Sequence, residues 1–421
     1  VCSSDLITMN KICPIPWIHL NINPSGDVYP CCLMTGENNV IGNLNHQSID
    51  DIWNNDFMKS LRREFIDGAE PEVCKLCFDR EQSSGISSRI HKLKRFESII
   101  NKIPNITLPD GTCTEMKLKY WDFRFSNICN FKCRSCGPSH SSSWVYDHAK
   151  IYQTPVLNKI EHLTTINNTH TIDYLKEQIP HVERINFAGG EPMLMAEHWE
   201  ILNLLIEHER FDVFLSYNTN CSTLEYNNKH ATDYWKHWES GKIDVAASID
   251  EIGDRAELIR SGTKWTKIEH NLIELSNMPN VLLRPSITVG AWNVFRLPEI
   301  ITHLTHIGVI RKVNTLINYN NFHLNLLFHP SHYHVHILPD EYKTVIIEKL
   351  RSFVDMYNHN YNTSIDLLFS QTLFELSKPY DEDAAKSFIE ISDKIDNIRH
   401  ENIFNIIPEL KIIKKKLKST T

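Results

Sequence analysis

The sequence contains no long apolar run, no excess of positive charge and no internal repeat. No stretch reaches the roughly 18 apolar residues that a membrane-spanning helix needs, and no basic segment followed by an apolar one predicts secretion. The formal net charge of -8 gives no general attraction to nucleic acid or to anionic lipid. We therefore expect a cytoplasmic protein that has neither a nucleic acid nor a membrane as a partner.

Cysteine is the residue type that stands out in this chain. Its eleven cysteines are an odd number, and most stand in tight clusters rather than as separated pairs. In a chain of 421 residues without an export signal, such clusters favour metal binding over a disulfide framework. Cys2 is set apart, because residues 1–6 look foreign to the fold, and we expect native sequence to begin near Ile7 or Met9.

The first part of the chain, residues 7–110, is rich in turn formers and cysteine. Residues 23–27 predict a hairpin turn between two short extended pieces. Ser48 is placed to cap a helix that runs to Phe65, with Asp51 at the capping-box position. Residues 105–114 resemble a linker. We expect a small cysteine-rich α+β domain here.

Short apolar runs alternate with helical periods in residues 115–340. The expected strands are Lys117–Phe125, Arg184–Phe187, Asp212–Tyr217, Ile243–Ile249, Val281–Val289 and His323–Phe328. The expected helices include Glu197–His208, Thr266–Leu275 and Leu297–His306. Because such alternation implies parallel pairing, we predict an α/β fold, a partial (β/α)6 barrel of the TIM type. The polar stretch 152–171 is interpreted as an insertion.

Residues 341–421 predict a helical C-terminal segment. Residues 341–357 and 384–398 carry apolar side chains at helical spacing. The basic run 411–418 is expected to be a solvated end of the chain.

Cys129, Cys133 and Cys136 have the spacing C-x3-C-x2-C. Three thiolates so close can bind one [4Fe-4S] cube and leave its fourth iron without a protein ligand. A zinc site with a fourth ligand from elsewhere is the alternative, although zinc ligands more often come as two separated pairs. The three cysteines follow a predicted strand directly, at the C-terminal mouth of the barrel, where such folds place their chemistry.

This cysteine loop resembles the signature of the radical S-adenosylmethionine (radical SAM) enzymes. The resemblance implies that S-adenosylmethionine (SAM) binds the open iron and is cleaved by one electron to a 5′-deoxyadenosyl radical, which abstracts hydrogen from a substrate. It also implies a reductant such as flavodoxin or ferredoxin. One departure is Ser135, where many members carry an aromatic residue.

Further segments support the resemblance and imply contacts to the cofactor. Gly189, Gly190 and Glu191 resemble the family's GGEP segment, which holds the amino group of SAM. Ser248 and Asp250 stand on alternate residues at a strand end, where both can reach ribose.

Other residues at the strand ends are weaker candidates for the same cofactor. Ser216 and Asn218, with Asn220, form the polar end of the third strand. Val289 and Asn293 follow the fifth strand, where the family places adenine contacts, and Arg255 and Arg260 are candidates for the carboxylate of SAM; surface arginine is the alternative.

Cys13, Cys31, Cys74 and Cys77 form a second group. Four thiolates can ligate either a complete iron–sulfur cube or a tetrahedral zinc ion, and spacing alone does not choose. The group resembles the auxiliary-cluster modules called SPASM and twitch, which implies an auxiliary [4Fe-4S] cluster placed before the barrel. Cys31 is favoured over the adjacent Cys32 by its spacing from Gly26.

Four histidines stand close together at positions 329, 332, 334 and 336. Alternate histidines on a strand can bind a metal, but Pro330 interrupts the pattern, so we expect them to line a pocket instead. Cys113 and Cys221 belong to no cluster and are expected to be buried hydrophobic residues.

The sequence therefore predicts a radical SAM enzyme with an N-terminal twitch/SPASM-like domain. Its substrate is expected to be a peptide or protein, or else a carbohydrate-type small molecule. Two alternatives stay open: a zinc-stabilised binding protein without radical chemistry, and a non-catalytic scaffold with the radical SAM fold.

Overall fold

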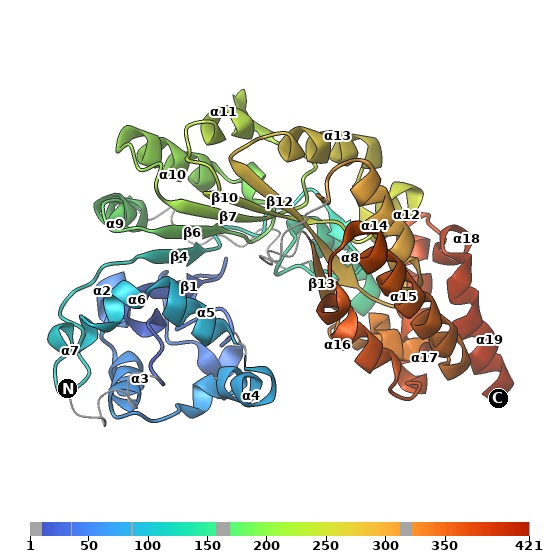
Figure 1. Ribbon diagram of the computed structural model, residues 1–421, viewed down its shortest axis with the longest axis horizontal. Helices are drawn as coiled ribbons and strands as arrows, with labels where there is room; N and C mark the ends of the chain where they lie inside the picture. Colours follow the sequence, from blue (N-terminus) through green and yellow to red (C-terminus); the bar gives the residue numbers. More distant parts are fainter. Residues whose placement is uncertain (1–10, 35, 86, 157–168, 312–321, 421) are drawn as a thin grey trace. The chain divides into compact units, whose positions relative to one another are not determined.

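The computed structural model describes residues 11–34, 36–85, 87–156, 169–311 and 322–420 (Figure 1). Residues 1–6 and most of the stretch 152–171 lie outside this part of the chain. Two compact units form: a first unit of residues 1–127, 160–189 and 195–216, and a second of residues 128–159, 190–194 and 217–421. The domain boundaries expected from the sequence, at about 110 and 340, stay a prediction.

The strands of the first unit follow the order β6-β4-β1-β2-β3. Their bounds are β1 His19–Ile22, β2 Asp27–Tyr29, β3 Gly42–Asn43, β4 Tyr120–Phe123 and β6 Arg184–Phe187. The predicted hairpin is confirmed, because β1 and β2 pair antiparallel. Strand β1 also pairs parallel with β4, so that His19 lies opposite Tyr120. Both strands are buried at every residue, as central parallel strands are.

The helix expected over residues 48–65 is two helices. Ser48 caps α2 (Ile49–Trp53), and the capping box with Asp51 is present as predicted. The chain then leaves the helix, and Asn55 caps α3 (Asp56–Ile66) by accepting a hydrogen bond from the N–H of Met58 at 2.9 Å. An asparagine that bonds its own downstream backbone restarts the helix here.

The remaining helices of the first unit surround these strands. They are α4 Lys75–Ser84, α5 Ser88–Arg95, α6 Glu97–Ile100, α7 Ile103–Ile106, α9 Thr169–Gln178 and α10 Ala196–Glu207. The expected helix at residues 197–208 is therefore confirmed. The stretch expected to be a linker contains a bridge between Thr107 and Cys113.

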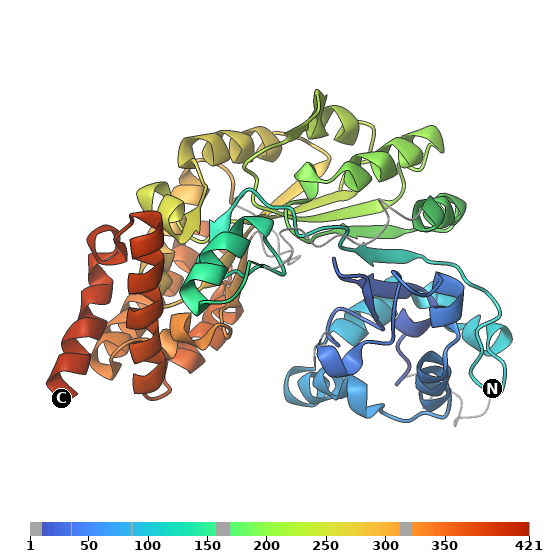
Figure 2. The same cartoon turned by 180° about the vertical axis from the view of Figure 1, so that it is seen from behind.

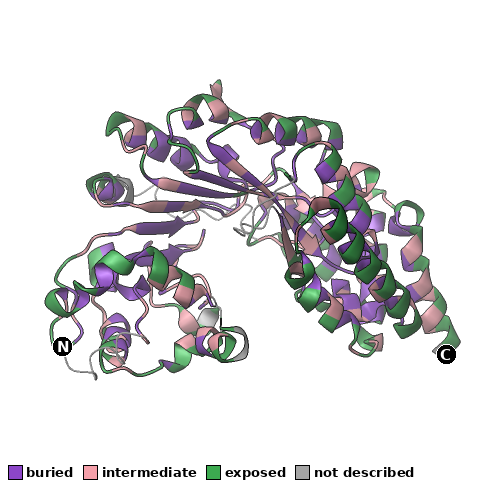
Figure 3. Ribbon diagram, viewed as in Figure 1, coloured by how far each residue is buried: buried purple, intermediate pink, exposed green. Residues whose placement is uncertain are grey.

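The strands of the second unit follow the order β13-β12-β10-β7, and the unit contains β7 from Tyr217 onward. Their bounds are β7 Phe214–Thr219, β10 Ile243–Ser248, β12 Val281–Val289 and β13 His323–Leu326. Strand β10 pairs parallel with β12, and β12 with β13. Along β12 buried and half-buried residues alternate, so one face packs into the core (Figure 3). Parallel strands with intervening helices confirm the predicted α/β class.

Two short ribbons and the barrel helices complete the middle of the second unit. The ribbons pair β5 (Lys132–Cys133) with β11 (Arg260–Ser261) and β8 (Glu225–Tyr226) with β9 (Lys229–His230). The helices are α8 Val145–Tyr152, α11 Ala231–Trp235, α12 Gly253–Ile259, α13 Trp265–Ser276 and α14 Leu297–His306.

The C-terminal segment is helical, as predicted. Its helices are α15 Asp340–Tyr361, α16 Asp366–Leu376, α17 Glu382–Arg399, α18 Ile403–Ile406 and α19 Lys411–Thr420. Helix α19 corrects the expectation of a solvated tail, since Ile413 on it is fully buried. No helix among the described residues has the length and apolarity to cross a bilayer.

Candidate functional site

The loop of Cys129, Cys133 and Cys136 is fixed by the residues that follow it. Ser143 donates to the carbonyl of Cys129 at 2.6 Å, and the indole of Trp144 donates to the carbonyl of Cys133 at 2.7 Å. Ser141 holds the carbonyl of Phe131 in the same way at 2.6 Å. The loop backbone is thus positioned by hydrogen bonds before any group binds its sulfurs.

Gly262 lets the β11 side of the second unit approach this loop closely. Its φ is +106°, and a Cβ at this position would lie 2.7 Å from the carbonyl oxygen of Asn130. A side chain there is excluded both by the backbone conformation and by the contact. The approach brings Arg260, which pairs with Cys133 across the ribbon, to the cysteines.

Cys133 is buried, whereas Cys129 and Cys136 are half-buried. Burial raises the pKa of Cys129 to about 11 and that of Cys133 to about 12, and it raises the pKa of Cys136 as well. The positive charge of Arg260 opposes this rise at all three thiols. Because metal ligands must be thiolates, a cation bound here would displace these protons.

The spread of the sulfur atoms argues against zinc. Four thiolates on one zinc ion lie about 3.8 Å from one another, given a Zn–S bond of about 2.3 Å. Among the described residues, neither cysteine group brings three ligand atoms within 4.8 Å of one another. Such a spread is compatible with a wider centre, such as an iron–sulfur cube.

Glu191 is a buried carboxylate beside the cysteine loop, 1% exposed. Its backbone N–H donates to the carbonyl of Ile128 at 2.7 Å. Its carboxylate accepts from the hydroxyl of Thr219 at 2.7 Å and from the N–H of Asn220 at 2.8 Å. Glu191 therefore ties the end of β7 to the residue before Cys129, and burial raises the pKa of its carboxyl.

Asn220 is the residue of the β7 end that comes nearest to the cysteines. Its side-chain amide lies 4.0 Å from the sulfur of Cys129 and donates to Asn130 at 3.0 Å. Asn130 in turn donates to Ser222 at 2.8 Å. Neither Asn130 nor Ser222 was expected as a site residue, although Asn130 directly follows the first cysteine of the motif.

Both carboxylate oxygens of Asp250 are bonded to neighbouring protein groups. One carboxylate oxygen pairs with Arg260 at 2.8 Å, and the other accepts from the N–H of Thr288 at 2.9 Å. Asn293, fully buried, donates to the carbonyls of Asp250 and Thr288. Asp250 and Asn293 thus join the ends of β10 and β12, whereas Ser248 is half-buried at the end of β10.

The other expected contacts divide between the two units. Gly189 lies in the first unit with φ +128°, and a Cβ there would stand 2.9 Å from the carbonyl of Ser126. Ser216, also in the first unit, bonds to Asn186 at 3.0 Å. In the second unit Asn218 is exposed, and Arg255 pairs with Glu409 at 2.9 Å.

Helix α17 is bonded to the cysteine loop and packs against α8, a feature that the sequence did not reveal. Figure 2 shows α8 beside the C-terminal helices. Arg399 pairs with Asp147 of α8 at 2.8 Å and donates to the carbonyl of Lys132 at 2.8 Å. Arg134, 1% exposed, pairs with Asp396 and with Glu401, the latter at 2.7 Å. All three ion pairs join residues more than 250 positions apart in sequence, and pairing over that separation leaves no local signal.

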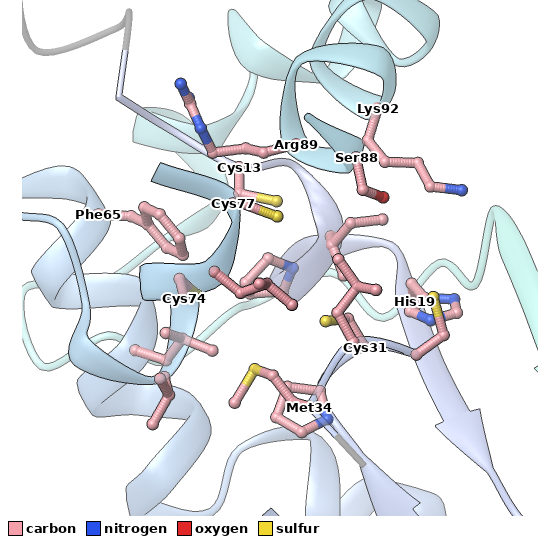
Figure 4. A pocket seen from close by; sticks show the side chains of 18 of the residues that line it. Cys13, His19, Cys31, Met34, Phe65, Cys74, Cys77, Ser88, Arg89 and Lys92 are labelled. Carbon is pink, nitrogen blue, oxygen red and sulfur yellow. The ribbon is translucent and has the colours of Figure 1, made fainter. Parts of the chain in front are cut away.

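The second cysteine group lies in the first unit. Cys13, Cys31, Cys74 and Cys77 line one pocket there, as Figure 4 shows. Burial raises the pKa of Cys13 and Cys31 to about 12. Burial also raises the pKa of Cys74, together with the charges of the other three thiols, whereas Asp122 is the charged neighbour that most raises the pKa of Cys32. Cys113 and Cys221 are buried, as expected.

Two family models match this chain. Residues 123–274 match the radical SAM superfamily, and residues 13–78 match SPASM, an iron–sulfur cluster-binding domain. The two matches contain all seven cysteines of the two groups. The prediction of a radical SAM domain with a SPASM-type domain before it is therefore confirmed, and with it [4Fe-4S] clusters and SAM as the cofactors of this type of protein.

Among solved structures the likeness is weak. Native anSMEcpe with bound AdoMet is 17% identical, with a TM-score of 0.37, and the match covers 57% of this chain and 62% of that one. The chain thus spans less than two thirds of anSMEcpe. Streptococcus suis SuiB bound to S-adenosylmethionine is 11% identical over 81% of this chain and 69% of that chain, with a TM-score of 0.32. SuiB bound to its precursor peptide SuiA is 12% identical over 94% of this chain and 74% of that one, with a TM-score of 0.32. No curated protein matches the chain.

Proposed function

We propose, for a chain in which a SPASM iron–sulfur domain precedes a radical SAM domain, that the protein is an enzyme that cleaves SAM reductively and abstracts a hydrogen atom from its substrate. The single observation that supports this most is the cysteine loop itself. Its three thiols stand on one hydrogen-bonded backbone, within the region that matches the radical SAM superfamily.

Cys129, Cys133 and Cys136 would hold a [4Fe-4S] cluster that supplies one electron to the sulfonium of SAM. Arg260 acts on the same three sulfurs, since its guanidinium favours their charged forms. Asp250 in turn holds Arg260 and so positions that charge, and it stays a candidate for ribose. Ser248 keeps the ribose assignment.

The amino group of SAM is still proposed to bind at Gly189, Gly190 and Glu191. Glu191 has a second role. Its carboxylate is already an acceptor for Thr219 and Asn220, so it also fixes the Asn220 amide beside Cys129. Ser216 and Asn218 stay candidates for the cofactor, supported by their place at the end of β7.

Cys13, Cys31, Cys74 and Cys77 would fully ligate an auxiliary [4Fe-4S] cluster, which supports a role in electron transfer or structure rather than in substrate binding. The neighbouring charges support Cys31 rather than Cys32 as the ligand, because Cys31 and not Cys32 is among the thiols that raise the pKa of Cys74. A peptide or protein is the proposed substrate class, with a carbohydrate-type molecule as the second candidate. Flavodoxin or ferredoxin would supply the electron, in the reducing cytoplasm that free thiols favour.

The test is anaerobic reconstitution with iron and sulfide, followed by incubation with SAM and dithionite. The proposal predicts 5′-deoxyadenosine from the wild type and none from Cys133→Ser. A protein that stays colourless after reconstitution would instead support the zinc-stabilised alternative. A brown protein that yields no 5′-deoxyadenosine would support the non-catalytic scaffold.

A further inference from the structure

Three metal-ligating side chains converge in the second unit, far in sequence from both cysteine groups. His334 and His336 come from the segment after β13, and Glu375 from α16. One ligand atom from each lies within 4.8 Å of the other two. The Nε2 atom of His336 is 2.8 Å from Oε2 of Glu375, and that of His334 is 3.9 Å from the same oxygen.

The two histidines were expected to line a pocket, together with His329 and His332. The structure separates the four. His334 and His336 stack edge to face, with ring centroids 3.9 Å apart, whereas His329 is exposed. The segment forms two short 3-10 turns rather than a strand, so the histidines do not alternate across a strand face. No pattern near the histidines predicts Glu375 as their neighbour.

The three facing atoms are buried, and none makes a hydrogen bond of good geometry, although two of them are only 2.8 Å apart. Buried polar atoms left in this state are costly. Buried donor atoms gathered this closely without satisfied hydrogen bonds are typical of metal ligands. A tetrahedral ion with bonds of about 2.1 Å separates its donors by about 3.4 Å, which lies between the two observed distances.

The neighbouring cations are already engaged. Lys378 binds the other carboxylate oxygen of Glu375, Oε1, at 2.7 Å, which turns Oε2 toward the histidines. Lys343 is bonded to the carbonyl of Lys378 and pairs with Asp340 at 2.8 Å. The ammonium groups of Lys378 and Lys343 are thus bonded elsewhere and do not lie between the three ligand atoms.

We propose that His334, His336 and Glu375 bind one divalent transition-metal ion, zinc being the favoured one, at a site separate from both cysteine groups. Two imidazoles and a carboxylate suit zinc and its neighbours better than magnesium or calcium. Three protein ligands leave one tetrahedral position for water. The ion would join α16 to the segment after β13 and so brace the C-terminal helices.

Metal binding has one specific consequence for His334. Its Nδ1 accepts a long hydrogen bond, 3.2 Å, from the N–H of His336. An imidazole that binds a metal through Nε2 carries its proton on Nδ1. When a metal binds, His334 therefore loses the hydrogen bond at Nδ1 and gains a metal bond at Nε2.

The experiment uses the full chain with both cysteine groups loaded with iron. The holoprotein is passed through EDTA and desalted, then titrated with zinc sulfate, and bound zinc is counted by mass spectrometry. We expect one zinc per chain and a rise in melting temperature. His336→Ala and Glu375→Gln should lose both, while the matched control His332→Gln, in the same segment but outside the group, should keep both.

Two results would overturn the proposal: wild-type holoprotein that binds no zinc, or variants that bind as much zinc as the control. Circular dichroism and iron content show whether each variant is folded. If one is not, zinc-edge X-ray absorption of the wild type decides alone. Nitrogen and oxygen neighbours with imidazole scattering support the site, and sulfur neighbours place the zinc on cysteine and contradict it.

Discussion

Replacing Arg399 of helix α17 by methionine should weaken the attachment of the cysteine loop to that helix. The guanidinium and the carboxylate of Asp147 form a pair at 2.8 Å in which each side chain is 2% exposed. The same guanidinium donates to the carbonyl of Lys132, next to Cys133. Methionine keeps the length of the side chain but removes both interactions.

The expected loss of folding free energy depends on which ion-pair partner Asp147 retains in the variant. Breaking a buried ion pair costs about 3–5 kcal/mol, because it leaves a buried charge unpaired. Lys132 still contacts Asp147 at 3.1 Å and is 32% exposed, so we place the loss at the low end, about 3 kcal/mol, or about 150-fold in the folding equilibrium. If the loop binds iron as proposed, that iron should become easier to remove.

The assay is anaerobic denaturation in urea, followed by circular dichroism and by the iron–sulfur absorbance. Lys394→Met is the matched control, since Lys394 pairs with Glu390 on the same helix but at the surface. That variant should unfold like the wild type. If Arg399→Met does the same and keeps its cluster, helix α17 does not hold the loop as we describe.

Three further predictions follow from other residues. Gly189→Ala should be more destabilising than Gly308→Ala, because both glycines have positive φ, +128° and +79°, but only Gly189 also meets a carbonyl, at 2.9 Å; equal melting temperatures would show that the contact does not matter. Burial lowers the pKa of His19 from 6.5 to about 4. Between these pH values the unfolded chain binds a proton that the folded state excludes. The free energy of unfolding should therefore fall as the pH drops from 6.5 toward 4, by up to about 1.4 kcal/mol per pH unit. His19→Gln should flatten that slope in urea titrations, and an unchanged slope would assign the proton elsewhere. Cys77→Ala should lower substrate turnover but leave cleavage of SAM without substrate largely intact, and joint loss of both activities would contradict separate roles for the two cysteine groups.

The barrel strands and the cysteine groups could be predicted because their signals are local. Strand β12 runs over the predicted residues, Val281–Val289, since its apolar run is bounded by turn formers. The capping box at Ser48 needs three residues of separation and was also found. Family resemblance, not spacing, supplied the choice of iron–sulfur over zinc.

What the sequence concealed depends on long-range contacts. The parallel pairing of β1 with β4 joins segments about one hundred residues apart, and no local sequence pattern predicts it. Helix α16 was missed because its apolar residues lie on all sides: Phe369 is fully buried, whereas Leu367 is 84% exposed. The pairing of Glu375 with the histidines was hidden for the same reason, since it required that helix.

The central claim is that the cysteines at 129, 133 and 136 leave one iron of their cluster open to SAM. Electron paramagnetic resonance of the dithionite-reduced protein tests it most directly, with Cys74→Ser used to remove the signal of the auxiliary cluster. The account predicts that adding SAM changes the g values of the remaining cluster signal. A spectrum that is identical with and without SAM, in protein with full iron content, would contradict it.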